Sequence, residues 1–523
     1  MPDLEDQSEK PTSPVQSPAS STTTIAALYP ETDLDKGIIG WDGQDDPNNP
    51  QNFAPKRKWM LLALMSSFTF ISPLASSMFS PAISYVAADF GVTNETLLSF
   101  SVTIFLLGYT VSSPLPSPHH QPLPILTIPG RPPLHRPLSE IYGRRITLSA
   151  ANWFFVVWQI GCALAPNLSA LIVFRLFAGM GGVGCITLGA GVIADLFPRT
   201  QRGMATSIWS MGPLIGPVVG PIAGGFIGET IGWRWVFWIL LIASGTIGAC
   251  IELLNRETYA PVLIRWKTAK LARELNRPEL RSAYDISQGT TPPTVSQALK
   301  QGLRRPIILI CKSPIVLLLS IYMAFVYGLL YLFFTTITSV FEQTYGFSTG
   351  LAGLSYLGIG VGFFIGMTVV AMTSDRMVVK LTARNNGVFQ PEMRLPTMII
   401  FACFLPISFF WYGWSAKYEV QWIVPIIGMA PFGIGMMGIY MPIQTYVIDC
   451  YPAYAASANA ALTATRSLVG AVLPLAGPKL FDSLGLGWGN SLLGFLALAF
   501  VPVPILFNRY GQKIREKWVV NLD

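Results

Sequence analysis

The sequence predicts an all-α membrane protein whose twelve transmembrane helices form two six-helix bundles, and three observations support this prediction. First, 51% of the 523 residues are hydrophobic and only 12% are charged, whereas about a quarter of a typical soluble chain is charged. Second, apolar segments close to the roughly 20 residues that span a bilayer recur from Trp59 onward. Third, a long polar stretch separates six such segments from six others. A soluble core could not cover this much apolar surface, so lipid must cover it.

The apolar segments fit helices rather than β-strands, because lipid cannot satisfy exposed backbone groups and a β-barrel would show short alternating strands. Each segment should therefore cross the membrane as one helix. The predicted spans are residues 59–81, 97–115, 146–165, 169–195, 204–228, 234–254, 307–340, 350–373, 396–415, 421–446, 457–481 and 488–508.

The polar segments define the remaining organisation of the chain. Residues 1–57 are rich in Ser, Thr, Pro, Asp and Glu, which predicts a disordered tail, and they lack the pattern of a cleaved signal peptide. An N-terminal bundle at 58–254 and a C-terminal bundle at 307–508 are joined by a linker at 255–306 and followed by a tail at 509–523. A plan of six and six spans favours two packed halves around a central pathway.

Loop charges predict the orientation. Basic residues precede the first span and follow the second and fourth, and ten Lys or Arg lie from Arg256 to Arg305. The alternate loops carry mostly acidic residues, so both termini and the linker should be cytoplasmic. The net charge of +7 comes from these clusters beside spans rather than from one soluble face, which argues against a nucleic-acid partner.

The fifth span carries two residue types at a spacing of four. The glycines should form one stripe that another helix backbone can approach closely, and each proline removes a backbone hydrogen bond and can bend the helix. This pattern predicts a helix that is both a packing surface and a hinge, rather than only one half of a static helix pair. Glycines of the eighth span offer a partner stripe. The residues are Gly212, Gly216, Gly220, Gly224 and Gly228 with Pro213, Pro217 and Pro221, and the partner stripe is Gly358, Gly362 and Gly366.

Basic residues near or inside spans have two possible roles. Arg144 and Arg145 could be topology anchors alone, or they could pair with Glu140, four residues before Arg144, in a charged cluster. Arg175 lies inside the fourth span, where a guanidinium costs several kcal/mol unless it is paired or faces water. It either has a functional role or extends toward the interface.

The energy source and the proton carrier can be narrowed by elimination. The sequence contains no phosphate-binding G-x-x-x-x-G-K-[ST] motif, so an ion gradient must drive any uphill movement. The three histidines lie in one unusual insert, which leaves acids at the membrane edges as candidate proton carriers. These acids are Asp195, Glu342 and Asp449.

Aromatic residues of the seventh and tenth spans recur at helical spacing. They could line an apolar cavity with a few polar groups, or they could only pack against lipid and other helices. The candidates are Tyr327, Tyr331 and Phe334 in the seventh span and Tyr440 and Gln444 in the tenth.

Several motifs together resemble the major facilitator superfamily. The residues Gly216, Gly220, Pro221, Gly224 and Gly225 match the antiporter motif G-x-x-x-G-P-x-x-G-G. Pro217 lies within this motif, and Gly212 precedes it by four residues and extends its glycine stripe. PLSEIYGRR resembles the loop motif between the second and third spans, and RLFAGMGG resembles the fourth-span motif. WDGQDDPNNPQNF, RETYAPVL, PEMRL and YAASANAA are similar to segments of the fungal twelve-span drug:proton antiporters, so the resemblance runs from about Trp41 to the C-terminus.

The resemblance implies a major facilitator fold and a proton-coupled antiporter that exports drugs, toxins or secondary metabolites by alternating access. It implies a cytoplasmic latch between the halves, made by Glu140, Gly143, Arg144 and Arg145, and a role for Arg175 in proton coupling. It also implies a monomer in the plasma membrane that needs no cofactor or metal and has a small organic molecule, protons and lipid as its partners.

One region departs from the family. About 29 residues separate Tyr109 from Ser139 where the family has about ten, and the insert at about 112–136 is rich in proline, which cannot continue a helix. Its composition and its position between intact motifs favour a retained intron or a gene-model error.

Other functions remain as alternatives. The same fold could make an importer or facilitator of small solutes such as polyamines, although the antiporter motif argues against it. A membrane receptor is disfavoured by the number of spans, and an embedded enzyme by the lack of clustered His, Cys or paired carboxylates at depth.

Overall fold

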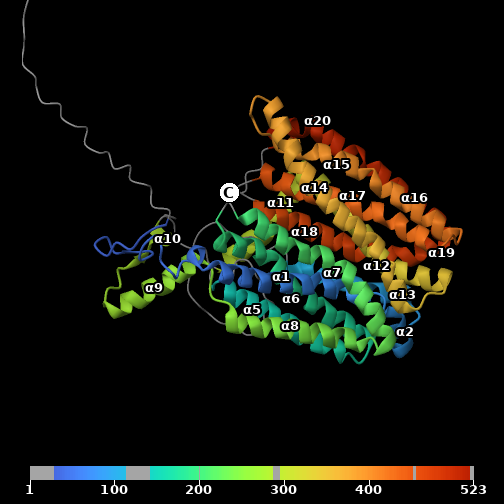
Figure 1. The fold of residues 1–523 in the computed structure, drawn as a ribbon, viewed down its shortest axis with the longest axis horizontal. Helices are drawn as coiled ribbons and strands as arrows, with labels where there is room; N and C mark the ends of the chain where they lie inside the picture. The colour runs from blue at the N-terminus through green and yellow to red at the C-terminus, as the bar shows by residue number, and fades with distance from the viewer. Residues whose placement is uncertain (1–28, 113–141, 199–200, 287–294, 452–454, 519–523) are drawn as a thin grey trace, which may run out of the picture.

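The computed structural model describes residues 29–112, 142–198, 201–286, 295–451 and 455–518, which are helical for most of their length. Two layers of long helices lie one beside the other in Figure 1, the first half in blue to green and the second half in yellow to red. A smaller unit made by α9, α10 and the segment before α1 lies at one end of the bundle. We call that end the linker side and the opposite end the far side.

The first half contains seven helices in its described residues. Its spans pack pairwise, with α1 on α7, α5 on α6 and α8, and α3 on α6. The short helix α2 lies on the far side (Figure 1). The elements are α1 (Pro55–Met78), α2 (Ile83–Phe90), α3 (Glu95–Ser112), α5 (Arg144–Ala163), α6 (Leu168–Leu196), α7 (Arg202–Thr230) and α8 (Arg234–Leu254).

The second half repeats this scheme of packed long helices. Helix α14 packs on α17, α16 packs on α17 and α19, and α12 packs on α18, while α3 against α18 and α7 against α13 join the halves. The elements are α11 (Val295–Lys312), α12 (Pro314–Tyr345), α13 (Thr349–Leu354), α14 (Leu357–Arg384), η2 (Pro391–Arg394), α15 (Leu395–Ala402), α16 (Phe404–Lys417), α17 (Ile423–Cys450), α18 (Ala455–Val472), η4 (Leu473–Ala476), α19 (Gly477–Phe500) and α20 (Pro502–Lys517).

The described residues contain eleven segments that are long and apolar enough to cross a membrane. Ten of them correspond to the first ten predicted spans. The last, Ser457–Lys517, is 61 residues long and includes both the eleventh and the twelfth predicted spans. Within it the backbone leaves the helical region at Gly485, where φ is 69° and ψ is 171°. This break lies between the eleventh and twelfth predicted spans, so the eleven segments of the described residues fit the twelve predicted spans.

Prolines explain where two predicted boundaries differ from the structure. The seventh span begins at Pro314 rather than at residue 307, because Ser313 caps the helix by accepting a hydrogen bond from the Val316 amide at 3.2 Å. Proline favours the first turn of a helix, where its missing N–H has no partner to lose. The ninth span is divided at Cys403, where Pro406 offers no N–H to the carbonyl of Ala402.

The small unit on the linker side joins the segment before α1 to the linker between the halves. Strand β1 (Ile38–Ile39) pairs in parallel with β2 (Arg281–Ser282). Trp41 is buried and donates from Nε1 to the Tyr284 hydroxyl at 3.1 Å. The unit also contains η1 (Pro50–Asn52), α9 (Ala260–Glu274) and α10 (Ala283–Ile286).

This unit differs from the disordered tail that the sequence predicts for residues 1–57. A small apolar core of Ile39, Trp41, Ile264 and Leu280 holds it together, and its two halves are far apart in the sequence. Composition alone does not predict an ordered structure for this segment, because its few apolar residues pack against residues more than 200 positions away in the sequence. Several predictions fall on residues outside the described ones. These residues are 1–28, 519–523 of the C-terminal tail, most of the proline-rich insert at about 112–136, and Glu140.

Candidate functional site

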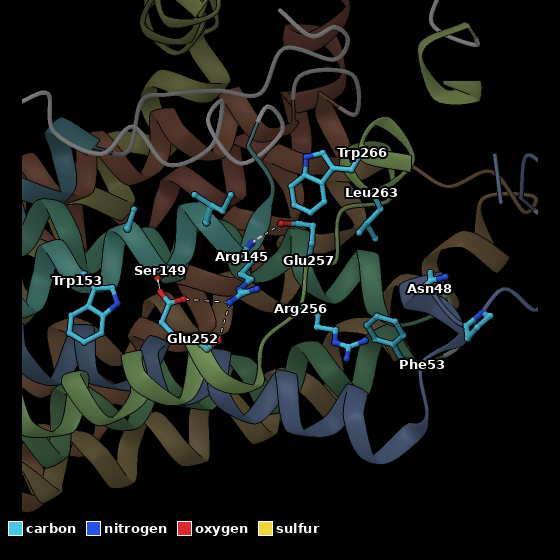
Figure 2. Close-up of a pocket in the computed structure, with 13 residues that line it drawn as sticks. Asn48, Phe53, Arg145, Ser149, Trp153, Glu252, Arg256, Glu257, Leu263 and Trp266 are labelled. Carbon is cyan, nitrogen blue, oxygen red and sulfur yellow. Dashed lines mark hydrogen bonds and ion pairs between the residues drawn. The ribbon is translucent and has the colours of Figure 1, made fainter. Parts of the chain in front are cut away.

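A cluster of charged side chains lies on the linker side of the first half, and Figure 2 shows most of it. We call the set Arg144, Arg145, Asp195, Glu252 and Glu257 the linker-side charge cluster. It brings together the ends of α5, α6 and α8 and the start of the linker. It therefore lies where the first half meets the segment that leads to the second.

Glu257 caps the N-terminal end of α5. Its carboxylate accepts hydrogen bonds from the backbone amides of Arg144 at 2.8 Å and Arg145 at 3.2 Å, and from those of Thr258 and Tyr259 at 3.0 and 2.9 Å. Only 5% of Glu257 is exposed. A negative charge at this position satisfies amides that the helix leaves unpaired and faces the positive end of its dipole.

Gly143 makes this cap possible. Its φ of 98° favours glycine, and a Cβ atom there would lie 2.0 Å from Oε2 of Glu257. Gly143 therefore serves the close approach of the linker carboxylate to the helix end.

The two arginines pair with different acids. Arg144 donates from Nε to Asp195 Oδ2 at 3.1 Å, and both side chains are less than one-fifth exposed. Its guanidinium also lies 4.6 Å from the centre of the Tyr259 ring. Arg145 pairs with Glu252 at 3.6 Å in a more exposed position. These partners all belong to the first half or to the start of the linker. The described ion pairs of the cluster therefore connect segments of the first half and do not connect the two halves.

A cavity of about 680 Å³ adjoins the cluster. Arg145, Glu252 and Glu257 line it together with apolar groups that include Trp153 and Trp266 (Figure 2). Two basic and two acidic side chains line its wall, since Arg256 is the fourth charged residue. The cavity combines apolar surface with balanced charge at the edge of the bundle.

Arg175 is buried inside the first half and does not extend toward an interface. It is 1% exposed, and its NH2 donates to the backbone carbonyl of Val102 at 3.1 Å. Its guanidinium carbon lies 4.6 Å from the ring centre of Phe79. No acidic partner lies within ion-pair distance among the described residues, so aromatic rings and carbonyl oxygens stabilise this charge.

The glycine stripe of α7 packs on α1, and not on the eighth span as the sequence predicts. A Cβ at Gly216 would lie 2.9 Å from the carbonyl oxygen of Phe70, and one at Gly224 would lie 1.7 Å from that of Met78. The eighth-span glycines instead face α17, where a Cβ at Gly362 would lie 2.1 Å from the carbonyl oxygen of Ala430. Both stripes therefore hold helices of the same half together, because equal spacing cannot tell which partner each stripe meets.

A different face of α7 meets the second half. A Cβ at Gly225 would lie 2.6 Å from the carbonyl oxygen of Thr349, and one at Gly353 would lie 2.8 Å from that of Pro221. The antiporter motif thus contributes residues to two interfaces, one within the first half and one between the halves.

Five hydrogen bonds in the described residues also join the halves. They connect α1, the segment after it, α2, α3 and α7 of the first half with α12, α13 and α18 of the second half. The pairs are Ser76–Tyr331, Ser80–Phe334, Tyr85–Thr349, Thr103–Ala471 and Glu229–Gly350.

The aromatic residues of the seventh span lie at this central interface. The rings of Tyr327 and Tyr331 are 5.3 Å apart, and those of Tyr331 and Phe334 are 5.2 Å apart. The Tyr331 hydroxyl lies 2.8 Å from Ser76 Oγ of α1. Tyr327 is partly exposed, whereas Tyr331 and Phe334 are almost fully buried.

Arg466 of α18 connects the two aromatic groups, and it is not among the site residues that the sequence predicts. It donates to the Tyr440 hydroxyl and lies 5.0 Å from the ring centres of both Tyr327 and Tyr440. An arginine deep inside the predicted span 457–481 was the available signal. Gln444, one turn beyond Tyr440, is partly exposed.

The three candidate proton carriers lie apart, each at the end of a span. Asp195 pairs with Arg144, and Asp449 pairs with Arg394. Glu342 on the far side accepts a hydrogen bond from the Thr349 hydroxyl at 2.6 Å. The described residues contain no group of three or more His, Cys, Asp and Glu that could hold a metal ion, and the three histidines lie in the insert outside them.

The fold and this site define a helical membrane protein of two packed six-span halves, with a charge cluster at the linker-side end of the first half and arginines buried in the spans. The sequence profile of the Major Facilitator Superfamily matches residues 65–474. The chain therefore belongs to the major facilitator superfamily, and it is a multi-pass membrane transporter rather than an enzyme.

Fungal transporters are similar to this chain over nearly its whole length. The MFS-type transporter penM of Penicillium rubens is 48% identical over 92% of this chain and 90% of its own length. The MFS transporter cpaT of Aspergillus oryzae is 46% identical over 91% of each chain. The efflux pump radE of Floropilus chiversii is 40% identical over 95% of this chain and 89% of its own.

Solved structures share the fold. The crystal structure of a D-xylose–proton symporter aligns with a TM-score of 0.61 at 17% identity, over 86% of this chain and 97% of that one. A partially occluded, inward-open conformation of the xylose transporter XylE from E. coli aligns with a TM-score of 0.60 at 18% identity, over 85% and 97%. The all-α membrane fold predicted from the sequence is confirmed.

Proposed function

We propose that this transporter exports small organic molecules by proton-coupled antiport, with the two halves exposing a central pathway alternately to each side of the membrane. The observation that carries the proposal is the double role of α7. One face of its antiporter motif packs on α1, while Pro221 and Gly225 meet α13 of the second half. In both contacts the helices approach each other at the level of the backbone. A small rotation of one half relative to the other would therefore break the contact between α7 and α13, while the contact between α7 and α1 within the first half would remain.

The direction of transport is proposed on two grounds. The antiporter motif is typical of exporting branches of the family, and a relative that is 40% identical is described as an efflux pump. The basic residues beside the linker-side ends of the spans support a cytoplasmic linker and cytoplasmic termini. We place the protein in the plasma membrane as a monomer, with drugs, toxins or secondary metabolites as its substrates.

We propose the residues that carry out coupling from their surroundings in the structure. The linker-side charge cluster would stabilise the conformation in which its ion pairs are formed. Glu140 would join this cluster. Asp195 is the favoured proton carrier of the three acids, because its protonation would remove the ion pair with Arg144 and so loosen the cluster. Arg175, Glu342 and Asp449 are the other candidates for proton coupling.

The proposal is tested by accumulation of a compound panel in cells with and without the protein. Export predicts lower accumulation in cells that contain it, and an uncoupler should abolish the difference. Gly225→Ala should weaken export at normal abundance, whereas Gly245→Ala, where nothing lies within 4 Å of an added Cβ, should not. Equal accumulation across the panel would refute export, and higher accumulation would indicate import instead.

A further inference from the structure

Among the described residues, Arg466 is a buried cation that has no acidic partner. It lies in α18 within a membrane-spanning segment and is 9% exposed. No acidic side chain lies within ion-pair distance among the described residues, and its Nε has no hydrogen-bond partner there. Its described partners are the Tyr440 hydroxyl and the faces of two tyrosine rings. These are weak substitutes for an anion, since a guanidinium in a span is costly unless it is paired.

Arg466 also borders the junction of the two halves. One turn further along α18, a Cβ at Gly470 would lie 2.9 Å from the Leu106 side chain of α3 in the first half and 3.0 Å from Tyr327. Tyr327 and Tyr440 are partly exposed although they lie in the interior of the bundle. The guanidinium therefore lies between Tyr440 and Tyr327, and Tyr327 borders the interface along which the halves would separate.

Arg175 provides an internal comparison. It is equally unpaired by acids, but it is enclosed by elements of the first half, including the carbonyl oxygens of Val102 and Ser76 and the ring of Phe79. Its Nε also lacks a hydrogen-bond partner among the described residues, but all of its described contacts lie within the first half. Arg466 instead has only tyrosine side chains as its described partners, and Tyr327 borders the junction of the halves, where separation of the halves would make room for another group.

We propose that Arg466, with Tyr327 and Tyr440, forms the part of the substrate site that binds the carboxylate of an aromatic organic acid. This inference rests on the proposed function, because it names the class of compound that the transporter carries. The carboxylate would take the unpaired Nε and replace the Tyr440 hydroxyl as an acceptor, a pairing that guanidinium groups form strongly and often at two points. The rings of Tyr327 and Tyr331 would contact the aromatic part of the same molecule.

The test measures binding to the purified full-length protein without requiring transport. The probes are 2-naphthoate, indole-3-acetate and cinnamate, each compared at pH 7 with its own carboxamide, which has nearly the same shape and no charge. Unfolding is monitored by tryptophan fluorescence, and dissociation constants are obtained from the rise in the unfolding temperature with ligand concentration. We expect each acid that binds to bind about tenfold more tightly than its amide, as befits a charge-assisted hydrogen bond.

Three variants assign that preference. Arg466→Gln should remove it, and Arg466→Lys should keep the charge but reduce the preference at least threefold, because lysine lacks the planar fork. Arg509→Gln removes one exposed positive charge elsewhere in the chain and should behave as the wild type. If Arg466→Gln does not fold, as judged by its unfolding temperature without ligand, the comparison between arginine and lysine carries the test.

The possible outcomes separate this inference from the proposed function. No binding of any of the three acids, equal binding of acids and amides by the wild type, or a preference that survives Arg466→Gln would overturn the carboxylate site. If the acids bind as expected but cells with the protein do not export them, the site stands and export fails. If cells export neutral or cationic compounds and the acid preference is absent, export stands and the carboxylate site fails.

Discussion

Replacing Gly224 by alanine should disrupt the packing of α7 on α1. The added Cβ would lie 1.7 Å from the carbonyl oxygen of Met78. Heavy atoms in proteins do not pack this closely, so the two helices would have to move apart by about 1.3 Å. Because the obstacle is backbone rather than a movable side chain, we expect a loss of about 1–3 kcal/mol in the free energy of unfolding. Alanine offsets about 1 kcal/mol of this loss through its higher helix propensity, so the net loss should be up to about 2 kcal/mol.

The assay is thermal unfolding of the purified protein, together with its surface abundance and export activity. Gly245→Ala in α8 is the matched control, since an added Cβ there meets nothing within 4 Å and the helix propensity of alanine should slightly stabilise it. Gly220→Leu combined with Gly224→Leu should abolish folding or export. If Gly224→Ala unfolds at the same temperature as Gly245→Ala, the close packing of α7 on α1 is not what stabilises the first half.

Three further predictions concern charges and caps. Gly143→Ala should cost about 2 kcal/mol, because the new Cβ displaces the carboxylate that caps α5 and the residue would hold a left-handed backbone; thermal unfolding measures it. Combining Arg144→Gln with Asp195→Asn should lower the free energy of unfolding by less than the sum of the two single losses. The difference, measured in a double-mutant cycle, should be about 1–3 kcal/mol. The Arg234 guanidinium holds the pKa of Asp89 below its usual value, so this half-exposed pair stabilises the protein above pH 4 and loses its effect as the pH falls through the lowered pKa.

Each of these predictions has its own control. Gly232 also has a positive φ but no atom within 4 Å of an added Cβ, so Gly232→Ala measures backbone strain alone. If Gly143→Ala and Gly232→Ala lower the free energy of unfolding equally, the cap by Glu257 does not contribute to stability. Strictly additive losses in the cycle would mean that the pair is not coupled. For Asp89→Asn, unfolding temperatures should approach those of the wild type below pH 4. A difference that stays constant from pH 7 to pH 3 would contradict the lowered pKa.

Much of the fold could be predicted from the sequence, because a bilayer imposes a length and a polarity that each span shows by itself. The start of one span and a break within another were less predictable because proline and capping decide them, as at Pro314 and Cys403. The pairing of the glycine stripes could not be predicted, since Gly216 and Gly362 follow the same period but meet different helices. Periodicity identifies a face of a helix, whereas its partner depends on the arrangement of all the helices.

The candidate site was predictable only in part, for a related reason. Arg144, Asp195 and Arg175 stood out as charges at or inside spans, but the sequence does not show that the first two pair. Glu257 reads as an ordinary acid of a polar linker, and its four amide donors become evident only in three dimensions. Arg466 carried the same signal as Arg175, and its importance depends on two tyrosines from other helices.

The pairing of β1 with β2 has a consequence for dividing the protein into pieces. These two-residue strands bracket the whole first half, since one precedes α1 and the other follows α9. They act as a noncovalent clasp that fastens the beginning of this half to the polypeptide leaving it. A gene split between Ile286 and Val295 would leave the clasp whole on one fragment, whereas a split just after Leu254 would separate its two parts. Co-expressed fragments should therefore reassemble better from the first division than from the second.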